Sequence, residues 1–372
     1  MKYAYPKSDG KKVDSLFSVL DENIGIGELY NELLKEPSYI REEDVKAERE
    51  QTGASEEEAY FSLMMKQTDV NVSDSDMKRL VQYYRLNEVK HLNEEEYLSN
   101  PYYKRIRPHK DTAGKWSLEY NYYAPFEGFI YEDVKTEPEH GYREITSYGY
   151  FGKKVPYLIL KEKNRVYMSI TPHEINTMKE AVNKANGNVI VYGLGLGYFP
   201  YMISLKDEVK SVTIVEEDKN VIRIFEDMIL PSFEHREKIH IVQNDAFEYA
   251  KERMAKGNFD FGFTDLWHDE QDGLEMYVRM KNINESLKKP VEMSYWIEES
   301  LLAIFRRLVL DMVSVEMDGG TDADFADKRT YFSLAENKLH SALKDHEISS
   351  YDALHAFVSD ENLKGLVRLL GK

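Results

Sequence analysis

The chain of 372 residues contains no cysteine. Disulfide bonds, thiolate nucleophiles and cysteine-based zinc sites are therefore excluded, and the composition fits a reducing compartment. Long apolar runs are missing too, because no uninterrupted stretch approaches the ~20 residues that a membrane span needs. The N-terminal sequence MKYAYPKSDGKK lacks the apolar core of a secretory signal, so we expect a cytoplasmic protein without membrane contact.

The chain is acidic, with a formal net charge of -18, and clusters of lysine and arginine are scarce. Proteins that grip nucleic acid usually neutralise phosphates with grouped lysines and arginines. The densest basic stretch (Arg105, Arg107, His109 and Lys110) is short and is typical of a solvated surface. The charge balance argues against a nucleic-acid partner and favours a small or cationic substrate.

The residue pattern divides the chain into four segments. Residues 1–115 carry apolar side chains at helical spacing and predict an N-terminal helical region. Residues 116–170 alternate aromatic or β-branched residues with polar ones, which predicts a small antiparallel β subdomain. Residues 171–318 alternate short strands with helices and predict an α/β, Rossmann-like domain with a doubly wound parallel sheet. Residues 319–372 predict a helical C-terminal segment.

Two local signals in the N-terminal region bear on its structure. Residues 14–34 predict a helix that is interrupted at a Gly-containing stretch. The segment Asn100-Pro101-Tyr102-Tyr103 resembles the Asn-Pro-Pro-Tyr signature of adenine-N6 methyltransferases. Its third position differs and no buried strand precedes it, so we interpret it as a turn after a helix.

Strand and helix signals are clearest from residue 155 onward. Thr171, Pro172 and Glu174 predict a helix start in which Thr171 is the N-cap and Glu174 closes a capping box. Beyond Val315 no further strand pair is evident. The predicted strands are a hairpin formed by 155–160 and 166–170, four parallel strands at 189–192, 212–215, 239–242 and 259–263, and a fifth at 291–296.

Glycines and an acidic residue follow the first two parallel strands, at the edge where open parallel sheets bind ligands. Gly193, Gly195 and Gly197 allow the backbone to turn sharply and to approach a ligand closely. The helix that follows points its N-terminal N–H groups toward the same place. Glu216 ends the second strand about 20 residues later, where an acidic side chain accepts hydrogen bonds from the ribose hydroxyls of an adenosine cofactor.

The third strand ends at Asn244-Asp245-Ala246. An aspartate at this position can accept a hydrogen bond from the adenine amino group. The alternative is that Asp245 caps the next helix, and one side chain can do both.

The fourth strand ends beside the place where the reacting part of a cofactor would lie. Asp265 is a candidate general base, and His268 is a second candidate for taking up a proton. Trp267 is a candidate for stacking on adenine or for contacting a sulfonium with its ring face. His268, Asp269 and Asp272 offer metal ligands, but no second histidine stands at ligand spacing, so we expect no metal.

Residues 150–285 resemble class I S-adenosylmethionine (SAM)-dependent methyltransferases, and within them the spermidine synthase-like group. The resemblance is carried by the small sheet before the parallel strands, the Pro172-His173-Glu174 helix start, the glycine loop, Val215-Glu216-Glu217-Asp218, Asn244-Asp245 and Asp265. It implies SAM or decarboxylated SAM as cofactor, and a homodimer by analogy. It also implies Asp265 as the base that activates an amine and places His173 at the amine site.

Two carboxylates of that family are absent. The glycine loop has Leu196 where an aspartate grips the amine, and His268 stands where the fourth strand carries a second aspartate. A diamine binds chiefly through such carboxylates, so their loss argues against spermidine synthesis. A family proline is also replaced, by Asp272.

Four functions remain to be weighed. The first is methyl transfer from SAM to a small molecule, with Asp265 or His268 taking up the proton. The second is aminopropyl transfer from decarboxylated SAM to an atypical amine. The third is NAD binding, which Tyr198 disfavours because it stands where a dinucleotide site needs its last glycine. The fourth is a catalytically idle domain that senses SAM or scaffolds a partner.

Overall fold

The computed structural model describes residues 2–3, 6–68, 70, 74–254, 256–321, 323–325 and 329–371. The other positions of the predicted N-terminal and C-terminal segments lie outside the described residues.

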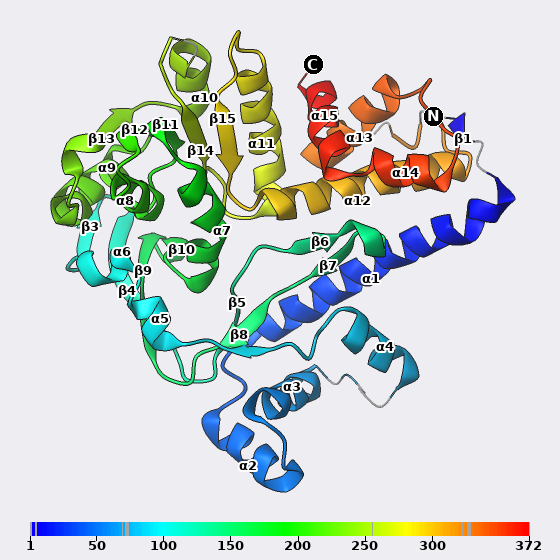
Figure 1. The fold of residues 1–372 in the computed structure, drawn as a ribbon, viewed down its shortest axis with the longest axis horizontal. Helices are drawn as coiled ribbons and strands as arrows, with labels where there is room; N and C mark the ends of the chain where they lie inside the picture. Colours follow the sequence, from blue (N-terminus) through cyan, green and yellow to red (C-terminus); the bar gives the residue numbers. More distant parts are fainter. Residues whose placement is uncertain are drawn as a thin grey trace.

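The second half of the chain forms a five-stranded parallel sheet, with strand order β13-β12-β11-β14-β15 (Figure 1). The sequence predicts all five strands. Residues 189–192 of the central strand are at most 1% exposed, as expected for a parallel strand that is covered on both faces. The strands are β11 (Gly187–Tyr192), β12 (Val209–Glu216), β13 (Ile239–Gln243), β14 (Phe261–Thr264) and β15 (Glu292–Tyr295).

Helices connect these strands, which confirms the predicted α/β arrangement. The chain moves outward from β11 to β13 and then returns to the other side of β11 to form β14. This reversal of strand order places a crevice at the carboxyl ends of the strands. The connecting elements are α7 (Pro172–Lys184), α8 (Tyr198–Ser204), α9 (Lys219–Ile224), η3 (Phe225–Ile229), η4 (Leu230–Ser232), η5 (Arg236–Lys238), α10 (Ala246–Tyr249), η6 (Ala250–Met254) and α11 (Glu270–Glu285).

A four-stranded antiparallel sheet precedes the parallel one, with strand order β10-β9-β4-β3. Its β9–β10 hairpin confirms the predicted one. Two smaller β structures accompany it, and in one of them β2 pairs in parallel with β8, so the β region is not purely antiparallel. The strands are β2 (Lys90–His91), β3 (Asp111–Ala113), β4 (Trp116–Tyr123), β5 (Gly128–Ile130), β6 (Lys135–Glu137), β7 (Arg143–Ile145), β8 (Tyr148–Tyr150), β9 (Val155–Glu162) and β10 (Arg165–Ser169), with η2 (Pro138–His140) between β6 and β7.

The described part of the predicted helical region, residues 1–115, is mostly helical, but it also contributes the strands β1 (Lys2–Tyr3), β2 and β3, and its first long helix is uninterrupted. Helix α1 (Gly10–Lys35) passes through Gly25 and Gly27 without a break, which corrects the expected interruption. Each glycine costs about 1 kcal/mol in a helix, and burial of the apolar face of α1 offsets this cost. The remaining elements are η1 (Lys7–Asp9), α2 (Glu42–Thr52), α3 (Glu56–Gln67), α4 (Ser75–Tyr83), α5 (Glu94–Leu98) and α6 (Pro101–Arg105).

Helices also follow the last parallel strand, and no final strand pair joins the parallel sheet among the described residues. Figure 1 shows the long helix α12 running above α1, with the β6–β7 ribbon between the two helices. No helix in the described part of the chain is both long and apolar enough to cross a bilayer. The C-terminal elements are α12 (Glu298–Met317), α13 (Tyr331–Ala342), β16 (Glu347–Ile348), which pairs with β1 (Lys2–Tyr3), α14 (Tyr351–Phe357) and α15 (Asp360–Leu370).

A buried asparagine on α1 ties this helix to the ribbon. Asn23 is 4% exposed and donates through Nδ2 to the Tyr142 carbonyl oxygen at 2.9 Å. Its Oδ1 accepts from the Tyr84 hydroxyl at 3.0 Å and from the Glu144 N–H at 3.1 Å. One side chain therefore satisfies three buried polar groups from two distant segments.

We expect Asn23→Ala to lower the free energy of unfolding by roughly 1–3 kcal/mol, because three buried polar groups lose their partner. Urea unfolding measures the change. Asn31→Ala, at an exposed position of the same helix, is the matched control and should change stability little. Equal stability of the two variants would contradict the role of Asn23.

Candidate functional site

The carboxyl ends of the central strands bring the predicted cofactor residues together. The N–H of Leu194, in the glycine loop, donates to Glu216 Oε2 at 3.3 Å. The N–H of Asn244 donates to the Glu216 carbonyl oxygen at 3.1 Å, and the N–H of Asp265 donates to the Tyr192 carbonyl oxygen at 2.9 Å. The ends of β11, β12, β13 and β14 thus form one continuous edge.

The glycine loop, residues 193–197, has positive φ angles at its three glycines and packs closely against neighbouring atoms. Gly193, Gly195 and Gly197 have φ values of 94°, 51° and 71°. A Cβ atom on Gly193 would lie 2.0 Å from the Asp265 carbonyl oxygen. Only glycine fits there, because a side chain would push the loop away from the end of β14.

The segment from Asn100 to Tyr103 supports this loop, a role that the sequence analysis missed. Asn100 caps α6 by accepting from the Tyr102 N–H at 2.9 Å, so the segment begins a helix. The Tyr102 hydroxyl donates to the Leu196 carbonyl oxygen at 2.6 Å, and Asn100 Nδ2 donates to the Tyr198 hydroxyl at 3.0 Å. The available signal was Asn-Pro, which suits an N-cap followed by a first helical position.

Glu216 and Asp245 already accept backbone hydrogen bonds. Glu216 accepts from Leu194 and, at 2.9 Å, from the Asp218 N–H, while burial raises the pKa of Glu216. Asp245 caps α10 by accepting from the Glu248 N–H at 2.8 Å, so its capping role is confirmed. A carboxylate oxygen that accepts one hydrogen bond keeps a second lone pair, so both acids retain capacity for a ligand.

Asp265 lies beside a second carboxyl group, that of Glu174. Burial raises the pKa of Asp265 to about 7. Burial and the negative charge of Asp265 together hold the pKa of Glu174 well above its usual range. Two neighbouring carboxylates resist carrying a charge together, so the pair retains a proton near neutral pH.

The position of Glu174 corrects its predicted capping role. Thr171 caps α7 as expected, because its side chain accepts from the Glu174 N–H at 3.4 Å. The Glu174 carboxyl group lines the same small cavity as Asp265 and does not close a capping box with Thr171. The helix start thus supplies an acid to the sheet edge.

The cavity beside the glycine loop is small. Its volume is about 10 Å³, which is about the space that one water molecule needs. Met168, from β10, fills much of this region, and its Sδ accepts from the Leu196 N–H at 3.2 Å. A Cβ atom on Gly195 would lie 1.8 Å from that sulfur.

The two predicted catalytic histidines line a different cleft, whose volume is about 470 Å³. His268 Nδ1 lies 2.9 Å from Asp272 Oδ2, and the His268 N–H donates to Asp272 Oδ1 at 3.0 Å. Burial lowers the pKa of His173 to about 4, so this ring is neutral at pH 7. Both histidines line this cleft and not the Asp265 cavity, but the two spaces adjoin, because His173 precedes Glu174 in α7 and His268 lies three residues after Asp265.

Trp267 is placed in the core. The indole is 4% exposed, and a Cβ atom on Gly273 would lie 2.8 Å from its ring. This packing favours a structural role for Trp267 over the predicted stacking on a cofactor.

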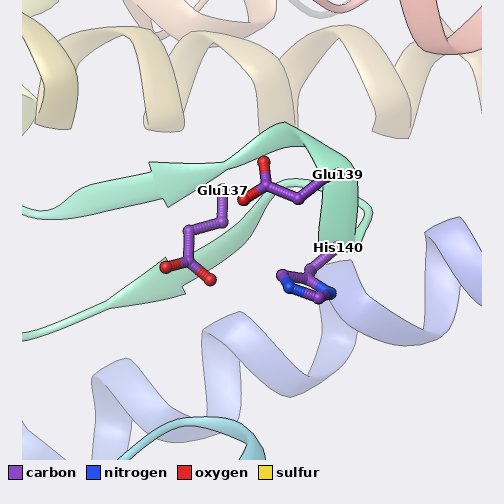
Figure 2. Close-up of side chains that lie close together, drawn as sticks. All are labelled: Glu137, Glu139 and His140. Atoms are coloured by element: carbon purple, nitrogen blue, oxygen red, sulfur yellow. The ribbon is translucent and has the colours of Figure 1, made fainter.

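One group of possible metal ligands occurs among the described residues: Glu137, Glu139 and His140 at the turn of the β6–β7 ribbon (Figure 2), with ligand atoms within 4.8 Å of one another. The Glu137 carboxylate accepts from Arg143 Nε at 3.1 Å and from an Arg85 Nη atom at 2.9 Å. These two cations supply the positive charge that a metal would bring. Glu137 is therefore the centre of an ion-pair network that links the ribbon to Arg85.

No family model and no curated protein matches the chain. Among solved structures it is similar to spermidine synthase from Thermotoga maritima, with 12% identity, 49% of this chain and 70% of that chain covered, and a TM-score of 0.28. It is also similar to spermidine synthase in complex with the transition-state analogue AdoDATO, with 12% identity, 49% and 71% covered, and a TM-score of 0.29. At such TM-scores no residue roles transfer, so the fold description rests on strand order and pairing.

The raised pKa of Asp265 predicts how stability depends on pH. Below pH 3.8, the pKa of an aspartate in the unfolded chain, Asp265 is protonated in both the folded and the unfolded state. Its burial as an uncharged group then has no pH-dependent cost to stability. As the pH rises toward about 7, the unfolded chain releases this proton and the folded chain retains it, so stability is lost. We therefore expect the Asp265→Asn variant to have a higher free energy of unfolding than the wild type at pH 8, by on the order of 4 kcal/mol.

Urea unfolding of both proteins at pH 5 and pH 8 measures this difference, which should shrink at the lower pH. Asp207→Asn, at an exposed aspartate, is the matched control. A constant difference between the two pH values would show that Asp265 ionises normally.

Proposed function

We propose that the chain is a transferase that binds a SAM-type adenosine cofactor along the carboxyl edge of the parallel sheet and transfers a methyl group to a small molecule. One observation carries this proposal. The glycine loop, Glu216, Asp245 and Asp265 follow four different strands and converge on one edge.

The residues present fit an adenosine cofactor. Glu216 lies against the glycine loop, where its remaining lone pairs can accept from ribose hydroxyls. Asp245 follows β13, one strand further out than Glu216, and keeps acceptor capacity for adenine beside its capping role. The positive φ angles of the loop suit glycine, so no Cβ atom stands between the loop backbone and a group that approaches it.

Asp265 and Glu174 supply the acid–base chemistry. Bound SAM would supply an electrophilic methyl group on a positively charged sulfur. With a pKa of about 7, Asp265 is ionised in a substantial fraction of molecules at neutral pH and can take the proton that the acceptor loses. Glu174, whose pKa is also raised, stays protonated beside it and limits the charge of the pair.

The cleft that His173 and His268 line favours a positively charged acceptor. Carboxylates outnumber cations among its lining residues, and its arginine, Arg307, is already paired with Glu144. This surplus of negative charge also suits an amine, which keeps aminopropyl transfer from decarboxylated SAM as the second candidate. The acidic lining residues are Glu28, Glu132, Glu144, Asp269 and Glu270.

Calorimetric titration with SAM, decarboxylated SAM, methylthioadenosine and NAD tests the cofactor. We expect the wild type to bind SAM, and Glu216→Gln to weaken binding by roughly 10–100-fold, because hydrogen bonds to a charged group are worth about 1.5–3 kcal/mol. Glu217→Gln is the matched control, since Glu217 is exposed and adjacent, and it should bind as the wild type does.

The pattern of ligands separates the alternatives. Selective binding of decarboxylated SAM would favour aminopropyl transfer, and binding of NAD alone would overturn the proposal. Tight SAM binding without S-adenosylhomocysteine formation across a panel of amine and hydroxyl acceptors would favour a non-catalytic sensor.

A further inference from the structure

The β9–β10 hairpin contains an irregularity directly opposite the sheet edge. Val166 pairs with Lys161 and Met168 pairs with Leu160, so Tyr167 is an extra residue in β10. A bulge of this kind bends a strand and re-aims its side chains. Here the bulge lets two successive side chains, Tyr167 and Met168, reach toward the carboxyl edge of the parallel sheet.

Met168 occupies the space next to the glycine loop. Its sulfur accepts the Leu196 N–H and lies directly on Gly195, where a Cβ atom would meet it at 1.8 Å. An N–H that points away from the sheet is the type of group that a ligand's acceptor atom would bind. Met168 therefore occupies the Leu196 N–H donor. It also fills the space beside Gly195 that the missing side chain leaves open.

Tyr167 covers the neighbouring part of the edge. Its ring packs edge-on against His268, with ring centroids 4.7 Å apart, and edge-on against Trp116 at 4.7 Å. Trp116 in turn donates from Nε1 to Asp218 Oδ2 at 2.7 Å. The ring thus spans from the end of β12 to the end of β14. Burial, and after it the charges of Glu216 and Asp265, raise the pKa of the Tyr167 hydroxyl.

We propose that Tyr167 and Met168 form a plug, and that the β10 arm of the β9–β10 hairpin must withdraw from the edge of the parallel sheet before an adenosine cofactor binds. The inference rests on the proposed function. The cavity between the glycine loop, Met168 and Asp265 has a volume of about 10 Å³, far below the roughly 300 Å³ or more of a typical ligand pocket, and neither Glu216 nor Asp245 lines it. β10 is the edge strand of its sheet and its first residues, 165 and 166, are exposed, so it can move while β9 stays paired with β4.

The plug and the cofactor compete for the same atoms. The affinity that is measured for the cofactor is therefore the intrinsic affinity reduced by the fraction of molecules in which the β10 arm is withdrawn. Shortening Met168 removes the sulfur from the loop and raises that fraction. Cofactor affinity should rise even though a side chain has been removed from the site.

Calorimetric titration of methylthioadenosine and SAM into the wild type, Met168→Ala and Val166→Ala tests the plug. We expect Met168→Ala to lower the Kd of methylthioadenosine by about tenfold, a change that corresponds to about 1.4 kcal/mol. Val166→Ala changes an exposed residue of the same hairpin and should leave the Kd within about twofold of the wild type. Met168→Leu, which keeps the side-chain volume but removes the sulfur acceptor, should fall between the two and serves if the alanine variant does not fold.

Stopped-flow tryptophan fluorescence adds a kinetic readout, because Trp116 contacts Tyr167. The observed rate for the wild type should level off at high methylthioadenosine concentration, where withdrawal limits binding, and should keep rising for Met168→Ala. Equal or weaker binding by Met168→Ala, with binding by the wild type, would overturn the plug and leave the proposed function standing. Binding of no nucleotide by either protein would overturn the proposed function and the plug with it.

Discussion

The contact between the glycine loop and the ends of the neighbouring strands is the constraint on which the site depends. Gly193 lies so close to the Asp265 backbone that a Cβ atom would stand 2.0 Å from its carbonyl oxygen. Leu194 donates to Glu216 from the same loop, and Tyr102 holds the Leu196 carbonyl oxygen from outside. A loop that is fastened on three sides keeps one backbone arrangement, which lowers the entropic cost of binding a ligand.

Two kinds of buried acid occur in this protein, and they indicate different roles. Burial acts to raise the pKa of Glu137, but Arg143 and Arg85 outweigh it and hold that pKa low, as expected for a structural ion pair. Burial raises the pKa of Asp265 to about 7, and its neighbour Glu174 is another acid. Such an arrangement destabilises the fold near neutral pH, and strongly perturbed pKa values of this origin cluster at functional sites.

Sequence patterns predicted the parallel strands, the β9–β10 hairpin and the Thr171 cap, because strand periodicity, turn residues and caps are local properties. Helix α1 ran through its glycines, since burial of its apolar face is a tertiary effect that a local pattern does not carry. The carboxyl group of Glu174 turned toward Asp265, although the local motif predicted a capping box. The plug could not be predicted, because a bulge at Tyr167 depends on how β10 pairs with β9.

The central claim is that an adenosine cofactor binds at the carboxyl edge of the parallel sheet, and a crystal structure of the protein with methylthioadenosine tests it most directly. The account predicts ribose at Glu216, adenine beside Asp245, and the β10 arm of the hairpin displaced so that Met168 no longer contacts Gly195. Ligand density elsewhere on the molecule, with Glu216 still bound only to backbone N–H groups, would contradict it.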